Sequence, residues 1–375
     1  MHRPLSYIEI SSHALRENVR TLRGLAPQKQ CACVVKANAY GHGQHEVISL
    51  IQKECDYLQV DDIEELRAVC ALTQKPTFVF GYVQKENLAE AVSLQGILCI
   101  YDEARIRLLE SIGKKRNTYI PIHIKIDALL GRQGVLPKDV SHIIDVLKKS
   151  PHVRLEGIYS HFSNIEDTKN SAHALRQWKQ FTVARELFSR AGYINLLVHI
   201  SATSGVLTHD PMLPTSLVRL GLGMYGMWPS EALAHEWKKK ITLHPVVRWV
   251  THVAQVKKIP TGFPVGYGCT FIAKRPTTIA VLPQGYSDGY DRGLSNKGEV
   301  LIHGKKVPII GRVAMNMIVA DVTRISGVHE EDEVVLLGSQ GGLSITAESI
   351  AEKIATINYE VTTRISPLLP RIITK

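Results

Sequence analysis

Short apolar runs alternate with amphipathic segments from Cys31 to about Tyr225. Between the runs, apolar residues recur at helical spacing, as in Ser141–Leu147, where they fall on one helix face. Eight such runs over roughly 200 residues, alternating with helices, predict a (β/α)₈ barrel. The alternative, an open doubly wound sheet, usually has fewer units and an early Gly-x-Gly-x-x-Gly turn, which this sequence lacks. The predicted barrel strands are Cys31–Val35, Tyr57–Val60, Thr77–Phe80, Ile97–Ile100, Tyr119–Ile126, Leu155–Tyr159, Leu196–Ile200 and Leu217–Leu220.

The pattern changes after about Trp237, where turn residues separate short apolar runs. Thr346 is a suitable N-cap for a helix over Ala347–Ala355, and a strand over Leu5–Ile10 is expected to join this part. The sequence therefore predicts a barrel over residues 11–236 and a mostly β domain over residues 237–375 that takes in residues 1–10. The strands predicted in this domain are Val246–Val256, Thr277–Leu282, Val300–Ile302, Lys306–Ile310, Met317–Val322 and Val334–Leu337.

Composition and charge exclude several classes of function. The chain has 375 residues, 45% of them hydrophobic, which is enough for two cores. Its formal net charge is +10, but the basic residues are dispersed, so no nucleic-acid partner is predicted. A solvated face or attraction of small anionic ligands better explains the charge. No apolar run of about 18 residues predicts a membrane span. The sequence starts without the apolar core of a secretory signal, so we expect a cytoplasmic protein.

The cysteines do not predict a metal site. Cys31 and Cys33 form the closest pair, and no second pair follows at zinc-site spacing. We expect both thiols on the same face of a buried strand, and no metal.

Unusual residues follow three of the predicted barrel strands, at the end where barrel enzymes place catalytic groups. Lys36 follows the first strand, Ser201–Gly205 the seventh and Gly221–Gly223 the eighth. A lysine amine can form a Schiff base with an aldehyde, and such loops can bind a phosphate. Taken alone, Lys36 could equally be a lysine that reaches solvent at a strand end. Taken alone, each of the two loops could be an ordinary turn. Together on one rim, they predict pyridoxal phosphate as the cofactor.

Nine motifs, in one order along almost the whole chain, carry a resemblance to a known family. They are Val34-Val35-Lys36-Ala37-Asn38-Ala39-Tyr40-Gly41-His42-Gly43, Lys125-Ile126-Asp127, Gly131-Arg132-Gln133-Gly134, Ser160-His161-Phe162, Val218-Arg219-Leu220-Gly221, Gly266-Tyr267-Gly268, Gly285-Tyr286-Ser287-Asp288-Gly289-Tyr290, Gly311-Arg312-Val313-Ala314-Met315 and Asn358-Tyr359-Glu360. The chain resembles the alanine racemases, which are isomerases that use pyridoxal phosphate. The first motif is shared with other barrel-type proteins that bind this cofactor, so the later motifs carry the specificity.

The resemblance implies two-base racemisation of alanine in a homodimer with shared active sites. Lys36 binds the cofactor and acts as one acid/base, and Tyr267 from the other subunit acts as the second, because racemisation needs a proton-transfer group on each face of a planar carbanion. Lys125 matches a lysine that is carbamylated in many members. The anionic carbamate would hold Arg132 in place to bind the substrate carboxylate.

The resemblance also assigns the positions around the cofactor. Arg219 matches an arginine that faces the pyridine nitrogen; because arginine keeps its proton, the ring is a weaker electron sink and transamination is disfavoured. Met315 is implied to line the substrate pocket, and Tyr286 its entrance. The other implied cofactor-binding residues are Tyr40, His161, Thr203, Gly221, Leu222 and Tyr359.

The sequence departs from the family pattern at four places. Ala128-Leu129-Leu130 stands where the family usually has Thr-Gly-Met, Ala202-Thr203 replaces Asn-Ser, and Asn316 replaces an Asp. The Arg usual before the final Val-Pro-Arg is missing at Leu368-Leu369-Pro370-Arg371. The first change lies between the carbamylated lysine and the carboxylate-binding arginine, so we expect an effect on activity or substrate preference.

Alternatives to an alanine racemase remain open at this point. One is a racemase of another small amino acid such as serine, and another is a degenerate homologue that binds the cofactor without catalysis. A barrel-type decarboxylase would have an acidic group in place of Arg219, and a single-barrel binding protein would lack the β domain with Tyr267. The sequence also leaves open whether D-alanine is supplied to a cell wall or degraded.

Overall fold

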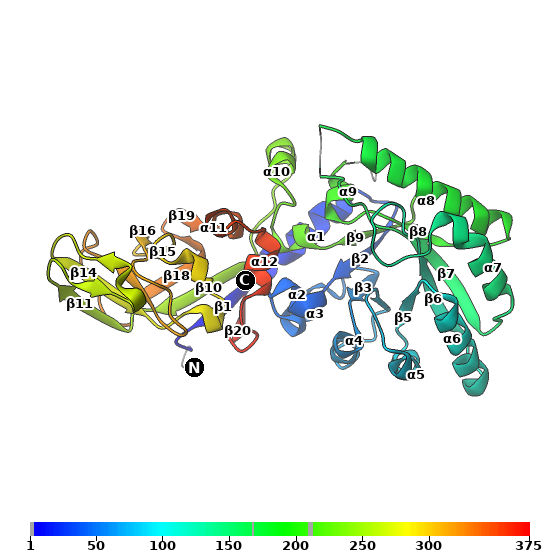
Figure 1. Cartoon of the computed structure of the whole chain (residues 1–375), viewed down its shortest axis with the longest axis horizontal. Coiled ribbons are helices and arrows are strands. Elements are labelled where there is room, and N and C mark those ends of the chain that lie inside the picture. Colours follow the sequence, from blue (N-terminus) through cyan, green and yellow to red (C-terminus); the bar gives the residue numbers. More distant parts are fainter. Residues whose placement is uncertain (1–3, 167–168, 209–212) are drawn as a thin grey trace.

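The computed structural model describes residues 4–166, 169–208 and 213–375. Met1–Arg3 lie outside the described residues. They are part of the segment 1–10 that was predicted to join the β domain, and of the N-terminal segment that was predicted to lack a secretory signal. The molecule is elongated, with the barrel at one end and the β domain at the other (Figure 1). Between them, α2 (Lys36–Tyr40) contacts α12 (Asn358–Thr363). The division at residues 236 and 237 stays a prediction.

Within the described residues, eight parallel strands form the barrel sheet in the order β8-β7-β6-β5-β4-β3-β2-β9. The two ends of this sheet meet, because the N–H of Ser216 donates to the carbonyl of Val198 and the N–H of Arg219 to that of Ser201. The predicted (β/α)₈ barrel is therefore confirmed. Its strands are β2 (Gln30–Val34), β3 (Tyr57–Val60), β4 (Thr77–Val79), β5 (Ile97–Ile100), β6 (Ile120–Lys125), β7 (Val153–Tyr159), β8 (Leu197–His199) and β9 (Leu217–Leu220).

Helices surround the barrel strands (Figure 1), and most residues of each strand are buried. In β2, Cys31 and Cys33 face the helices as free, buried thiols, whereas Ala32 faces the interior together with Phe78 and Tyr159. This alternation accounts for the continuous apolar runs in the sequence. The helices of this part are α1 (Ser12–Gly24), α3 (Gln44–Ile51), α4 (Ile63–Cys70), α5 (Leu88–Ser93), α6 (Glu103–Arg116), α7 (Val140–Lys148), α8 (Ala172–Arg190), α9 (Thr203–Thr208) and α10 (Glu231–Trp237).

The β domain is built from one large sheet and two smaller ones. The large sheet has the order β16-β15-β18-β10-β1-β20, with β19 on β18; the others are β11-β14-β17 and β12-β13. As predicted, the opening strand joins this domain, antiparallel to β10 and parallel to β20. The strands are β1 (Tyr7–Ser11), β10 (Val247–His252), β11 (Gln255–Ile259), β12 (Pro264–Val265), β13 (Phe271–Ile272), β14 (Thr277–Leu282), β15 (Glu299–Ile302), β16 (Lys305–Pro308), β17 (Ile318–Asp321), β18 (Glu333–Gln340), β19 (Leu343–Ile345) and β20 (Arg371–Thr374).

The prediction of one strand over Val246–Val256 is wrong. The chain changes sheets in the middle of this run, because the N–H of Val253 bonds to Asp332 and the N–H of Ala254 to Val281. The helix predicted after Thr346 is present as α11 (Ala347–Ile354), and the Thr346 side chain accepts a hydrogen bond from the N–H of its N3 residue.

The described ranges contain neither a candidate membrane span nor a candidate metal cluster. No helix in them is long and apolar enough to cross a membrane. No group of three or more histidine, cysteine, aspartate or glutamate side chains in them could hold a metal ion.

Candidate active site

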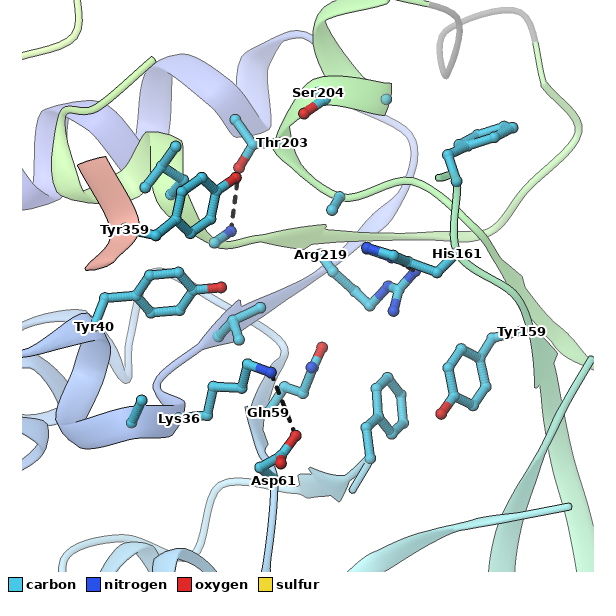
Figure 2. Close-up of a pocket in the computed structure, with 18 of the residues that line it drawn as sticks. Lys36, Tyr40, Gln59, Asp61, Tyr159, His161, Thr203, Ser204, Arg219 and Tyr359 are labelled. Atoms are coloured by element: carbon cyan, nitrogen blue, oxygen red, sulfur yellow. Dashed lines mark hydrogen bonds and ion pairs between the residues drawn. The ribbon is translucent and has the colours of Figure 1, made fainter. Parts of the chain in front are cut away.

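A cavity of about 640 Å³ lies at the carboxyl ends of the barrel strands (Figure 2). Residues that follow β2, β3, β6, β7, β8 and β9 meet there, together with residues of α12. The structure thus brings the site residues predicted for the barrel, and Tyr359 of the β domain, to one place. Those that line the cavity are Lys36, Tyr40, Lys125, Arg132, His161, Thr203, Arg219, Gly221, Leu222 and Tyr359.

Lys36 lies two residues after the end of β2 and extends into the mouth of the barrel (Figure 2). Its Nζ lies 3.4 Å from Oδ1 of Asp61, and 39% of its side chain is exposed. The lysine is therefore accessible to a ligand in the cavity and has a carboxylate as a close charged neighbour.

Hydroxyl and N–H groups gather beside α9 and α12, in the part of the cavity near Thr203 and Tyr359 (Figure 2). Oγ1 of Thr203 accepts hydrogen bonds from the N–H groups of Gly221 and Gly223, at 3.2 and 3.3 Å. Burial raises the pKa of Tyr40 to about 12 and also raises the pKa of Tyr359, so both hydroxyls stay protonated and can donate. We call these five residues the anion cradle. Their three hydroxyls are donors suited to a phosphate, and the two N–H groups orient the hydroxyl of Thr203.

Arg219, at the barrel strand β9, is fixed by backbone carbonyls. Its Nη2 donates to Ser160 at 2.8 Å and to Ile200 at 2.7 Å, and lies 3.3 Å from Nδ1 of His161. Its buried Nε has no partner among the described residues. Desolvation lowers the pKa of Arg219 to about 10, so the guanidinium is still charged at neutral pH, whereas desolvation and then Arg219 lower the pKa of His161 and keep that ring neutral.

Lys125 ends β6 and is almost fully buried. Its Nζ donates to Oε1 of Gln133 at 3.1 Å. Desolvation lowers the pKa of Lys125 to about 8, so a substantial fraction of its amine is neutral near physiological pH.

The loop after β6 is organised by Asp127. Its Oδ1 accepts from the N–H groups of Leu130 and Gly131, at 2.9 and 3.1 Å, and its Oδ2 accepts from that of Arg132 at 3.0 Å. Within this loop, Leu129 has a φ of +63°, in the left-handed region that disfavours residues with a Cβ. The residues in which the sequence departs from Thr-Gly-Met are therefore held by one buried carboxylate.

Comparisons with known proteins agree with the motifs. The profile described as alanine racemase, N-terminal domain, matches residues 10–229, and the profile described as alanine racemase, C-terminal domain, matches residues 246–373. The chain belongs to the alanine racemase family. It is 36% identical to alanine racemase 2 of Caldanaerobacter subterraneus over 97% of this chain and 94% of that protein. It is 37% identical to the alanine racemase of Syntrophobacter fumaroxidans over 95% and 94%.

Solved alanine racemase structures share the whole fold. The enzyme of Clostridium difficile 630 superposes with a TM-score of 0.93 at 28% identity, covering 100% of this chain and 97% of that one. The Bacillus anthracis enzyme with bound L-Ala-P has a TM-score of 0.93 at 27% identity, covering 100% and 96%. The Bartonella henselae enzyme, which has covalently bound pyridoxal phosphate, has a TM-score of 0.86 at 26% identity, covering 99% and 100%. The predicted fold class and family are confirmed.

In this alanine racemase family member, three of the site residues predicted in the β domain lie outside the cavity of their own chain, whereas Tyr359 lines it. Tyr267 is 74% exposed, Met315 56% and Tyr286 43%, and none of the three is among the residues described as lining the cavity. A single chain therefore does not bring Tyr267 to Lys36.

Asp61, Glu166 and Gln133 are among the cavity residues of this alanine racemase family member that were not predicted as site residues from the sequence. Asp61 directly follows β3, which is the same kind of position as that of Lys36 after β2, so its place at a strand end could have identified it. Glu166 accepts a hydrogen bond from Ser204 at 2.8 Å, and Gln133 accepts one from Lys125. No spacing or composition signal marks these last two contacts.

Proposed function

We propose that the chain interconverts L-alanine and D-alanine with pyridoxal phosphate, using Lys36 and Tyr267 of the partner subunit as its two acid/base groups. The observation that carries the proposal is the cavity in which Lys36, Arg219 and the anion cradle meet, in a chain of the alanine racemase family.

The residues present fit this cofactor. The anion cradle offers the hydroxyls of Tyr40, Thr203 and Tyr359 to the phosphate. Its two backbone N–H groups hold Oγ1 of Thr203 in place. A Cβ on Gly221 would lie 2.9 Å from Oη of Tyr40, so a glycine at this position leaves space in the anion cradle. The buried Nε of Arg219, which has no partner in the described part of the chain, is a donor for the pyridine nitrogen. Lys36 supplies the amine.

The residues of the cavity then have distinct tasks. When bound, pyridoxal phosphate supplies a carbonyl carbon to which amines bond and a ring that withdraws electrons from the α-carbon. Lys36 takes or gives a proton on one face of that carbon, and the partner's Tyr267 acts on the other. Arg132 binds the substrate carboxylate by charge-assisted hydrogen bonds. Because Arg219 keeps its proton at neutral pH, it donates a hydrogen bond without protonating the ring.

A carbamate on Lys125 is part of the proposal. Carbon dioxide adds to a neutral amine, and the lowered pKa of Lys125 supports a neutral fraction. The resulting anion would be an acceptor for Arg132 on the same cavity wall.

A homodimer would supply the second base. Tyr267, Met315 and Tyr286 are large side chains left exposed on one domain, and exposed apolar surface commonly marks an interface. A closed two-fold dimer has two equivalent sites to which both chains contribute. A cytoplasmic location remains a prediction from the sequence.

Turnover of L-alanine tests the activity most directly. Protein purified with pyridoxal phosphate should form D-alanine from L-alanine. Loss of optical activity measures this reaction, which should be faster than the racemisation of serine. Borohydride reduction and peptide mapping should place the cofactor on Lys36, and Lys36→Ala should lose both the adduct and the activity.

The outcomes separate the alternatives. Cofactor on Lys36 without turnover of any small amino acid would identify a degenerate homologue that only binds the cofactor. A higher kcat/KM for serine than for alanine would identify a serine racemase. An adduct on another lysine would contradict the assignment of Lys36.

A further inference from the structure

The backbone that follows Lys36 is wound in the left-handed direction. Ala37, Asn38, Ala39 and Tyr40 have φ values between +52° and +54°. A run of left-handed residues that have a Cβ is unfavourable for L-amino acids, so surrounding contacts must hold it. Because Lys36 begins this turn, the contacts that hold the turn also fix where the lysine side chain starts.

Side chains from distant parts of the chain hold the left-handed turn. Oε1 of Glu65, in α4, accepts a hydrogen bond from the N–H of Ala37 at 2.6 Å. Nη2 of Arg371, in the β domain, donates to the carbonyl of Gly41 at 2.9 Å. Glu65 therefore holds the start of the turn, directly after Lys36, and Arg371 holds its end.

The same carboxylate also holds the ion-pair partner of Lys36. Oε2 of Glu65 accepts from the N–H of Asp61 at 2.8 Å. Asp61 is further confined by Gly81, whose N–H donates to its carbonyl at 2.8 Å. A Cβ on Gly81 would lie 2.2 Å from that carbonyl oxygen and 2.8 Å from the Asp61 carboxyl carbon. One carboxylate thus bridges the backbone beside Lys36 and the backbone of Asp61, whose side chains meet at 3.4 Å.

We propose that Glu65 is a positioning residue that sets the distance between Lys36 and Asp61 by binding both backbone segments. It touches neither cofactor nor substrate and acts through the lysine. The proposal rests on the proposed function, in which Lys36 moves a proton, because a misplaced proton-transfer group lowers the rate of that step more than it weakens substrate binding.

The test compares cofactor-loaded wild type, Glu65→Gln, Glu65→Ala and the control Glu64→Gln. Glu64 lies next to Glu65 in α4 but is exposed and pairs with Arg67. A glutamine at position 65 has one acceptor oxygen where the carboxylate uses two, so it can keep only one of the two N–H bonds. Three properties are measured for each protein. They are the amide hydrogen exchange of peptides covering residues 36–41 and 57–63, kcat and KM for L-alanine, and the pH dependence of the visible absorbance.

For Glu65→Gln we expect exchange at least about 10-fold faster in one or both peptides but not elsewhere in the barrel, and kcat about 10- to 100-fold lower with KM within about 3-fold. The pH profile of the absorbance should shift, and Glu64→Gln should match wild type. If Glu65→Ala does not fold, Glu65→Gln carries the test.

Wild-type kcat and an unchanged pH profile in a folded Glu65→Gln enzyme would overturn the proposal. So would exchange that rises equally throughout the barrel, because Glu65 would then stabilise the fold and not this pair. Failure of the wild-type enzyme to racemise alanine would overturn the proposed function instead. The exchange and the absorbance would still report on the bridge made by Glu65 in that case.

Discussion

Leu129 occupies a backbone position that suits glycine. Its φ is +63°, and the family pattern has glycine there. A left-handed conformation costs an L-residue about 1–2 kcal/mol. The hydrogen bonds that Asp127 accepts from this loop offset that cost and keep its shape.

Replacing Leu129 by glycine should therefore stabilise the protein, whereas most exposed leucine-to-glycine changes destabilise. The relief of about 1–2 kcal/mol exceeds the roughly 0.5–1 kcal/mol that glycine loses through the unfolded chain, so urea unfolding should show a gain of up to about 1 kcal/mol. Leu136→Gly is the control, because Leu136 is similarly exposed but has a φ of −69°, and it should lose stability. Equal losses in both variants would contradict the argument.

The three described contacts of the Arg219 side chain all use Nη2, and its buried Nε has no partner among the described residues. Arg219→Glu should lower alanine racemisation at least about 100-fold and raise formation of pyridoxamine phosphate, because a carboxylate can keep a proton on the pyridine nitrogen. Chromatography of the released cofactor measures the side reaction. Arg219→Lys, which keeps a positive donor, should form less pyridoxamine phosphate than Arg219→Glu. Normal racemisation by Arg219→Glu with no side product would disprove this role.

At the scale of elements, α8 links two loops of the active site through Gln177. The amide of Gln177 is fully buried. Its Nε2 donates to the carbonyls of Ala128, at 2.8 Å, and His161, at 3.3 Å, and its Oε1 accepts from the N–H of Ser163 at 2.9 Å. Gln177 therefore connects the loop that leads to Arg132 with the loop that contains His161.

Gln177→Ala should loosen both loops, because it leaves buried carbonyls without partners at a cost of about 1–3 kcal/mol each. We expect KM for alanine to rise about 10-fold, since one of these loops leads to Arg132, which we propose binds the substrate carboxylate. Steady-state kinetics and thermal unfolding measure the two effects. The control Gln180→Ala removes the same amide further along α8 and should change neither. An unchanged KM with a lower Tm would show that Gln177 serves only stability.

The barrel strands were predictable because strands buried on both faces give continuous apolar runs. The left-handed turn after Lys36 was not, since Ala37-Asn38-Ala39 contains no glycine and alanine favours right-handed helices. Its conformation depends on Glu65 and on a residue of the other domain. The short helix α12 (Asn358–Thr363) has too few residues to show a helical period.

The candidate site was predictable to a similar degree. Lys36, Thr203 and Gly221 were found because they follow strand ends in a barrel. Arg219 and Tyr359 were found only through the resemblance, because nothing in their local sequence indicates a ligand.

At the scale of the whole molecule, the cavity of one chain contains Lys36 but not Tyr267. Mixed dimers test whether two chains complete each site. Lys36→Ala and Tyr267→Phe should each be nearly inactive, and with random exchange of subunits roughly a quarter of all sites should be wild type. Co-expression should restore about that fraction of the racemase activity. Tyr119→Phe, which changes another exposed tyrosine, should give full activity alone.

Recovery no greater than the sum of the separate variants would reject the shared site. If both residues came from one chain, every site in a mixed dimer would carry one of the two changes.

The pairing of β1 with β20 has a consequence for folding during synthesis. Ile8 lies beside Arg371 in this parallel pair. The ribosome therefore synthesises the whole barrel after β1 and before β20. Barrel strands pair mostly with their neighbours in sequence, which favours early folding of the barrel. The strand β1 waits unpaired until β10 and then β20 leave the ribosome. Because Arg371 of β20 also binds the turn that follows Lys36, the active site acquires its final support only after nearly the whole chain has been translated.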